Sequence, residues 1–169
     1  MTALLTLSYV LHVVAGGLWT GGVAYGTVAL LPAARRGEVT AQGLGRAVDL
    51  LLQVTRATGV VLPLTGAYQI WRLYPTSRLL GTTRGHLVLG MLLLWGVMNG
   101  LVELGVYRMR VADGDPPGLA RHTVERFGLG ADADPRALVG VARPYFLAAT
   151  ALTVLLLVDA ALLAGGVAP

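Results

Sequence analysis

The sequence contains no cysteine and no lysine, and both absences exclude whole classes of chemistry. Without cysteine the chain can form no disulfide, no iron–sulfur cluster and no thiolate copper site. Without lysine it can form no Schiff base, and all 13 basic residues are arginines. Charge is scarce as well, because charged residues make up 13% of the chain, against about a quarter in soluble globular domains. With 55% hydrophobic residues, the composition is that of an integral membrane protein.

Long apolar segments replace the missing charge. Each exceeds the roughly 20 residues that a helix needs to cross a bilayer. We expect spans over residues 3–31, 41–74, 86–108 and 136–165, with a polar loop at 111–135. Pro32 is expected to end the first span and Pro63 to kink its helix, whereas Pro144 is expected either to kink the last span or to mark its true start. The sequence therefore predicts an all-α, up-and-down antiparallel four-helix bundle in a single membrane domain.

Arginines are distributed unevenly between the two ends of this predicted bundle. The ends opposite the termini hold nine, at positions 35, 36, 46, 108, 110, 121, 126, 136 and 143, whereas the other side holds three, at 72, 78 and 84. Because arginine-rich loops stay in the cytoplasm, we expect a multi-pass inner-membrane protein with both termini outside. The net charge of +4 reflects these span ends and does not indicate nucleic-acid binding.

Polar side chains of different spans are predicted to gather in the outer half of the bundle. At about 1.5 Å per residue, His12 lies about 14 Å deep, Asp159 about 9 Å and Met91 about 8 Å. His86 lies near the outer surface. A histidine inside a span is costly and suggests a functional site, although it can also simply bond to a neighbouring span. We expect Asp159 to accept a hydrogen bond from His12, unless it stays protonated in its apolar surroundings.

Two ligands fit these residues. Imidazole and thioether groups suit copper, so the first hypothesis is a metal site from His12, Met91, His86 and Asp159. Packing against lipid or core is the simpler explanation for Met91. The alternative is haem b with His12 as axial ligand. His86 is the other cofactor-binding candidate, but a depth difference of about 12 Å makes a bis-histidine haem strained.

A second polar group is predicted at the inner end. Arg56 and Glu103 both lie about 27 Å from the outer side, so we expect a structural ion pair that Asn99 can join. His122 lies in the polar loop and is expected to be solvated.

The glycine pairs Gly17 and Gly21, and Gly22 and Gly26, fit the small-xxx-small pattern of close helix packing and make a homodimer a reasonable expectation.

Three stretches resemble a known family, the copper-resistance protein D (CopD-like) membrane proteins. They are Leu11-His12 followed by Trp19-Thr20-Gly21-Gly22, then Thr65-Gly66, and then LGTTRGHLVL at residues 80–89. The family usually carries a lysine near the position of Gly90, and this chain has none. The resemblance implies a small inner-membrane helical bundle that handles or takes up copper. The first span is also loosely similar to the membrane protoporphyrinogen oxidase family, which is associated with haem.

Three functions are therefore left open. The first is a copper-handling or copper-transport protein, reached from the outer side past His86 and binding the metal near His12, Met91 and Asp159. The second is a b-type haem protein that transfers electrons or acts as a redox enzyme. The third is an accessory subunit of a larger membrane complex, in which the polar groups only fasten the helices. The sequence does not decide whether the protein is an enzyme.

Overall fold

The computed structural model describes residues 2–130 and 132–166 and consists of helices and their connections. Its elements are α1 (Ala3–Tyr25), η1 (Gly26–Leu30), α2 (Leu31–Arg36), α3 (Ala41–Leu73), α4 (Thr76–Gly81), α5 (Thr83–Ala112), α6 (Leu119–Val124) and α7 (Pro135–Gly165). Four helical segments are long and apolar enough to cross a membrane, the first of which joins α1, η1 and α2. The predicted all-α four-helix bundle is confirmed.

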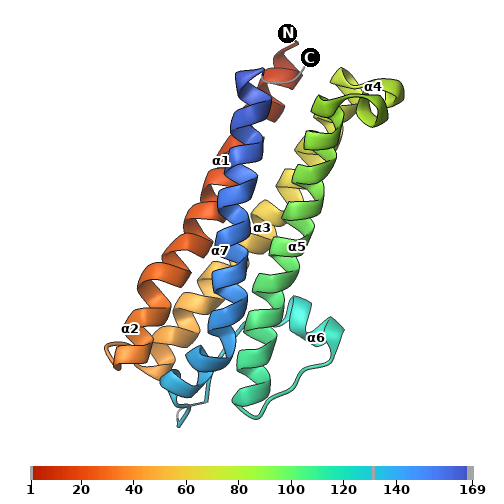
Figure 1. The fold of residues 1–169 in the computed structure, drawn as a ribbon. Helices are drawn as coiled ribbons and strands as arrows, with labels where there is room; N and C mark the ends of the chain where they lie inside the picture. Colours follow the sequence, from red (N-terminus) through yellow and green to blue (C-terminus); the bar gives the residue numbers. More distant parts are fainter. Residues whose placement is uncertain (1, 131, 167–169) are drawn as a thin grey trace.

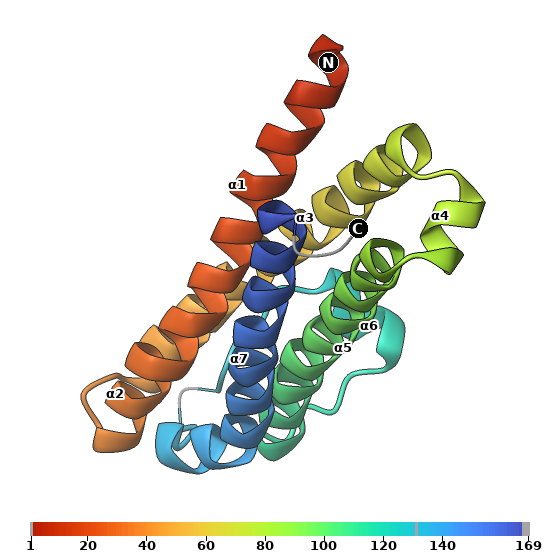
Figure 2. The ribbon, with the colours of Figure 1, turned by 45° about the horizontal axis from the view of Figure 1, so that its top comes forward.

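The long helices run side by side and alternate in direction (Figures 1 and 2). Both chain ends and the short helix α4 lie at one end of the bundle, which we call the termini end (Figure 1). Helix α2 and the connection from α5 to α7 lie towards the opposite end, which we call the arginine-rich end (Figure 1). Helix α6 lies beside α5 in both views. The connectivity is therefore up-and-down, as the sequence predicted.

The first helical segment does not end at Pro32, which corrects the expected boundary. A wider π turn, η1, precedes the proline, and the N–H of Leu31 bonds to Gly26 O. We attribute the tolerance of Pro32 to this turn, because it relieves the contact between the ring and the preceding turn. The helix ends at Arg36 because Gly37 adopts a φ of 81°, which a residue without a Cβ tolerates best.

Side-chain caps set the starts of the later helices. The hydroxyls of Thr40 and Thr82 accept hydrogen bonds from the N–H groups of Gly43 and Gly85. The Thr82 cap begins α5 three residues before the expected start at His86. Helix α7 is continuous from Pro135 to Gly165, so Pro144 lies inside it and does not mark its start.

The bundle consists of two closely packed helix pairs. A methyl group added at Gly22 would lie 3.2 Å from Leu51 Cδ1, so α1 and α3 approach closely. One added at Gly105 would lie 3.1 Å from Phe146 Cε2, so α5 and α7 do the same. We call these the α1/α3 pair and the α5/α7 pair.

The two pairs join each other mainly in the half near the arginine-rich end. There Trp19 and Phe146 are 1% exposed, and Thr27 Oγ1 bonds to Thr150 Oγ1 at 2.8 Å. Towards the termini end, Thr58 is the last residue of α3 that is buried, and on α5 no described residue between Gly85 and Met98 is buried. The hydrophobic core therefore holds the pairs together at one half, whereas only scattered residues such as Leu5 and Asp159 are buried at the other.

The predicted glycine contacts divide into two groups. Gly22 and Gly26 pack against Leu51, as close helix packing requires. Gly17 and Gly21 are exposed, and a methyl group added at either would meet no atom within 4 Å. These two glycines therefore take no part in packing within the described chain, and a homodimer through them stays a prediction.

Candidate functional site

His12 lies on the side of α1 that faces α3. Its Nδ1 is 2.8 Å from Thr65 Oγ1, one helix away. A methyl group added at Gly66 would lie 3.4 Å from His12 Cε1, so the missing side chain lets the imidazole lie flush against α3. Thr65 and Gly66 together therefore position the ring.

The hydrogen bonds of Thr65 favour the tautomer of His12 that carries its proton on Nδ1. Thr65 Oγ1 lies 2.7 Å from Val61 O and 3.1 Å from Leu62 O, and both are backbone carbonyls that only accept. The single hydroxyl proton is thus directed at its own helix, and the oxygen accepts from His12 Nδ1–H. In the neutral imidazole the lone pair then lies on Nε2, the nitrogen available to a metal.

Further polar contacts hold α1 against α3 around this histidine. Ser8 Oγ donates to Thr65 O at 3.2 Å, and Gln69 Nε2 donates to Ser8 Oγ at 3.2 Å. From the sequence, Thr65 was named only within the Thr65-Gly66 stretch and was not identified as the partner of His12. The signal was available, because a threonine inside a helix has a backbone-bonded hydroxyl that can accept from a neighbour.

Asp159 does not orient His12, which corrects the expected hydrogen bond. It lies on α7 and is 8% exposed, and a methyl group at Gly90 of α5 would lie 3.7 Å from its Oδ2. Its Oδ1 is buried without a hydrogen-bond partner in the described parts of the chain. The reason is the pairing of the helices, because α1 packs on α3 while α7 packs on α5.

The remaining metal candidates also belong to the α5/α7 side. His86 is exposed at the termini end, where its Nε2 donates to Leu80 O at 2.9 Å. Met91 is half-buried on α5. His12 contacts α3 and His86 contacts α4, so the structure does not join them through a direct contact. Within residues 2–130 and 132–166 there is no group of three or more His, Asp or Glu side chains that could hold a metal ion.

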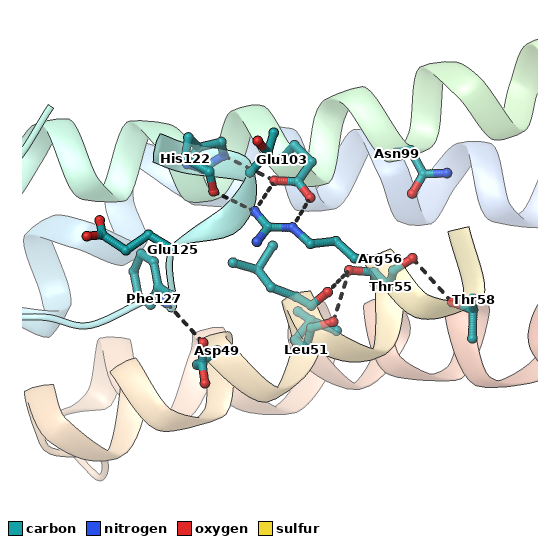
Figure 3. Close-up of polar contacts among 12 residues, drawn as sticks. Asp49, Leu51, Thr55, Arg56, Thr58, Asn99, Glu103, His122, Glu125 and Phe127 are labelled. Atoms are coloured by element: carbon teal, nitrogen blue, oxygen red, sulfur yellow. Dashed lines mark hydrogen bonds and ion pairs between the residues drawn. The ribbon is translucent and has the colours of Figure 1, made fainter. Parts of the chain in front are cut away.

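A second polar cluster lies near the arginine-rich end, where Arg56 and Glu103 form the expected ion pair (Figure 3). Arg56 Nε and Nη2 donate to the two carboxylate oxygens at 2.7 and 2.8 Å, which is the bidentate geometry that suits a guanidinium. Arg56 Nη2 also donates to His122 O at 2.9 Å. The pair therefore connects α3, α5 and α6.

His122 is buried, so the prediction that it is solvated is wrong. It is 4% exposed, its Nε2 lies 3.1 Å from Glu103 Oε2, and its ring meets that of Tyr107 edge to face (Figure 3 shows His122 beside Glu103). Burial lowers the pKa of its imidazole, and nearby Arg56 and Arg110 lower it further while Glu103 raises it. A polar loop in the sequence does not reveal that α6 folds back onto the bundle.

Asn99 does not join the ion pair, which is a further correction. Its Oδ1 accepts a hydrogen bond from Trp19 Nε1 at 3.0 Å. Its Nδ2 points to Trp95 O at 3.4 Å. Asn99 therefore ties α1 to α5 and joins the two helix pairs, in place of supporting Glu103.

Comparison with protein-family models, with curated proteins and with solved structures found no match for this chain. The resemblance to the copper-resistance protein D family therefore stays a prediction from the residues that carry it.

Proposed function

We propose that this protein binds copper within the membrane and handles or transports it, with His12 Nε2 as a ligand. The observation that carries this proposal is the contact of His12 Nδ1 with Thr65 Oγ1 at 2.8 Å. The Nδ1 proton of His12 is directed at Thr65, whose own proton is directed at Val61, so Nε2 keeps its lone pair. Metal-bound histidines are held in this way, with the other ring nitrogen bonded to an oriented partner.

The donor atoms suit a soft metal better than a hard one. The absence of a three-member cluster of His, Asp or Glu in the described residues argues against a preformed site for calcium or magnesium, which need many oxygen ligands. Cu(I) accepts imidazole and thioether donors, and Met91 supplies the thioether. Asp159 Oδ1 is a buried oxygen with no partner among the described residues and is the third candidate donor.

The proposed donors lie on both helix pairs. His12 belongs to the α1/α3 pair, whereas Met91 and Asp159 belong to the α5/α7 pair. Few residues are buried in this half of the bundle, and Asp159 is one of them. Copper held from both sides would join the pairs at the end where the hydrophobic core does not. With the arginine-rich end in the cytoplasm, the exposed His86 would be the first donor that an ion meets from outside.

The same free nitrogen also suits the iron of a haem, which is the competing function. A haem with His12 as axial ligand would make the protein a b-type cytochrome or redox enzyme. An accessory subunit of a larger complex would need neither ligand. These three functions differ in what the purified protein carries, and the experiments below separate them.

Replacing His12 by glutamine should weaken Cu(I) binding by far more than replacing its partner. We expect Thr65→Val to weaken it about 10–100-fold, because a partner of that kind orients and tunes the ligand. His12→Gln and Met91→Leu remove donor atoms and should each cost more than Thr65→Val. The affinity is measured on detergent-purified protein by competition with a chromophoric Cu(I) chelator.

Met98→Leu is the matched control for Met91→Leu. Met98 lies on the same helix but is 1% exposed in the hydrophobic core, so its replacement should leave Cu(I) affinity unchanged. Wild-type affinity in His12→Gln would refute the proposed ligand. If Met91→Leu and Met98→Leu lowered the Cu(I) affinity equally, the effect would be one of packing, and Met91 would not be a ligand.

A further inference from the structure

The segment that contains α6, residues 118–130, is held over the Arg56–Glu103 pair by contacts from two long helices. From α3, Arg56 donates to His122 O, and Asp49 Oδ1 accepts from Phe127 N at 2.9 Å (Figure 3). From α5, Arg110 Nη2 donates to the backbone oxygens of Glu125 and Arg126 at 3.1 and 2.9 Å. Most of these contacts are to backbone atoms of the segment, so they depend little on its side chains.

His122 is the only histidine of this segment, and its side chain is buried against the bundle. The ring of His122 lies between Glu103 and Tyr107 of α5. Neither ring nitrogen makes a well-aligned hydrogen bond within the described residues, although Nε2 is 3.1 Å from Glu103 Oε2. A buried imidazole without aligned partners is energetically costly, and the cost increases when the ring becomes charged.

The charges around His122 disfavour a further positive group. Arg56 from α3 and Arg110 from α5 are close, and Arg110 is itself 3% exposed. Glu103 is the facing carboxylate, but both of its oxygens are already bound by Arg56. Within the segment, Glu125 is engaged by Arg110 and Arg121. A proton on His122 therefore enters a site whose negative charges are already matched.

We propose that His122 is a proton-binding site, and that its protonation releases the α6 segment from the bundle. Release would free the backbone oxygen of His122 from Arg56 and open the Arg56–Glu103 pair to solvent at the arginine-rich end. The segment is thus an acid-sensitive cover on the one ion pair that joins α3 to α5 in the described chain. This inference does not depend on copper binding.

The direction of the pH dependence follows from the pKa of His122 in the docked and in the released segment. In the docked segment, burial holds the pKa of His122 below its usual value, whereas in the released segment the ring regains a pKa of about 6.5. The docked state is therefore fully favoured above about pH 6.5 and loses that advantage as pH falls towards the docked pKa. Because one proton is linked to release, the ratio of released to docked segment rises about tenfold per pH unit at most.

The test is a distance measurement, which the absence of native cysteine makes simple. Cysteines introduced at Val124 and Leu50, which are 84% and 62% exposed, carry two spin labels on full-length protein in nanodiscs. At pH 7.5 we expect a narrow distance distribution between α6 and α3. At pH 5 a broad and longer population should appear, with its onset below pH 6.5.

His122→Gln on the labelled protein should keep the distribution narrow at both pH values, because glutamine takes up no proton in this range. His86→Gln, at an exposed histidine of the termini end, should behave like the wild type. An unchanged wild-type distribution down to pH 5, or the same broadening in His122→Gln, would overturn the proposal. If glutamine does not dock at pH 7.5, the histidine signals of wild-type protein in NMR decide, and a His122 that titrates while α6 stays docked would overturn it.

Discussion

Gly105→Leu is expected to separate α5 from α7 and destabilise the bundle by about 1–3 kcal/mol. A methyl group at this position would already lie 3.1 Å from Phe146 Cε2 and 3.2 Å from Tyr145 Cβ. Phe146 is 1% exposed within the core, so its ring has little room to move. Thermal or denaturant unfolding of the purified protein, followed by circular dichroism, measures the loss.

Gly100→Leu is the matched control, on the same helix and with the same change. Gly100 is exposed, and a methyl group there would meet no atom within 4 Å. Leucine at this position should leave stability nearly unchanged or raise it slightly, because it replaces a poor helix former. Equal destabilisation by both substitutions would contradict the close approach of α5 and α7.

Removing one member of the Arg56–Glu103 pair should cost about 2 kcal/mol or more. Arg56→Leu leaves the Glu103 carboxylate with only His122 nearby, and Glu103→Leu leaves a guanidinium that is 27% exposed without its partner. Breaking a partly buried pair costs more than the pair contributes, because the remaining charge stays desolvated. The double variant Arg56→Leu, Glu103→Leu should regain most of the lost stability.

An exposed pair gives the comparison that the double-mutant cycle needs. Arg121 and Asp115 are 51% and 54% exposed and also lie 2.9 Å apart. Replacing either should leave the stability nearly unchanged, because solvent-exposed ion pairs contribute little. If Arg56→Leu proved as mild as Arg121→Leu, the inner pair would not be a structural link between α3 and α5.

The positions of the spans could be predicted because each signal is local. A run of apolar residues needs only its own length to indicate a membrane helix. Pro32 shows the limit of local reasoning, because a π turn before it lets the helix continue to Arg36. The depth of a residue in the membrane could also be predicted by counting residues along its helix. This count placed Arg56 and Glu103 at the same depth, and the two residues are paired.

The partners of individual side chains were harder to predict, because depth does not fix how each helix is rotated. Asp159 and His12 lie at similar depths, but they face different helices, α5 and α3. Asn99 lies one turn from Glu103 and yet binds Trp19. His122 needed knowledge that α6 folds back, which no periodicity contains. Rotation and long-range contacts, rather than composition, thus decided the chemistry of the site.

The most direct test of copper binding is metal analysis and a visible absorption spectrum on the same purified sample, oxidised and reduced. The proposal predicts bound copper, no Soret band, and loss of the copper in His12→Gln. A Soret band that shifts on reduction and disappears in His12→Gln would contradict copper and identify a haem protein. A sample with neither copper nor haem would also contradict the proposal and favour an accessory subunit.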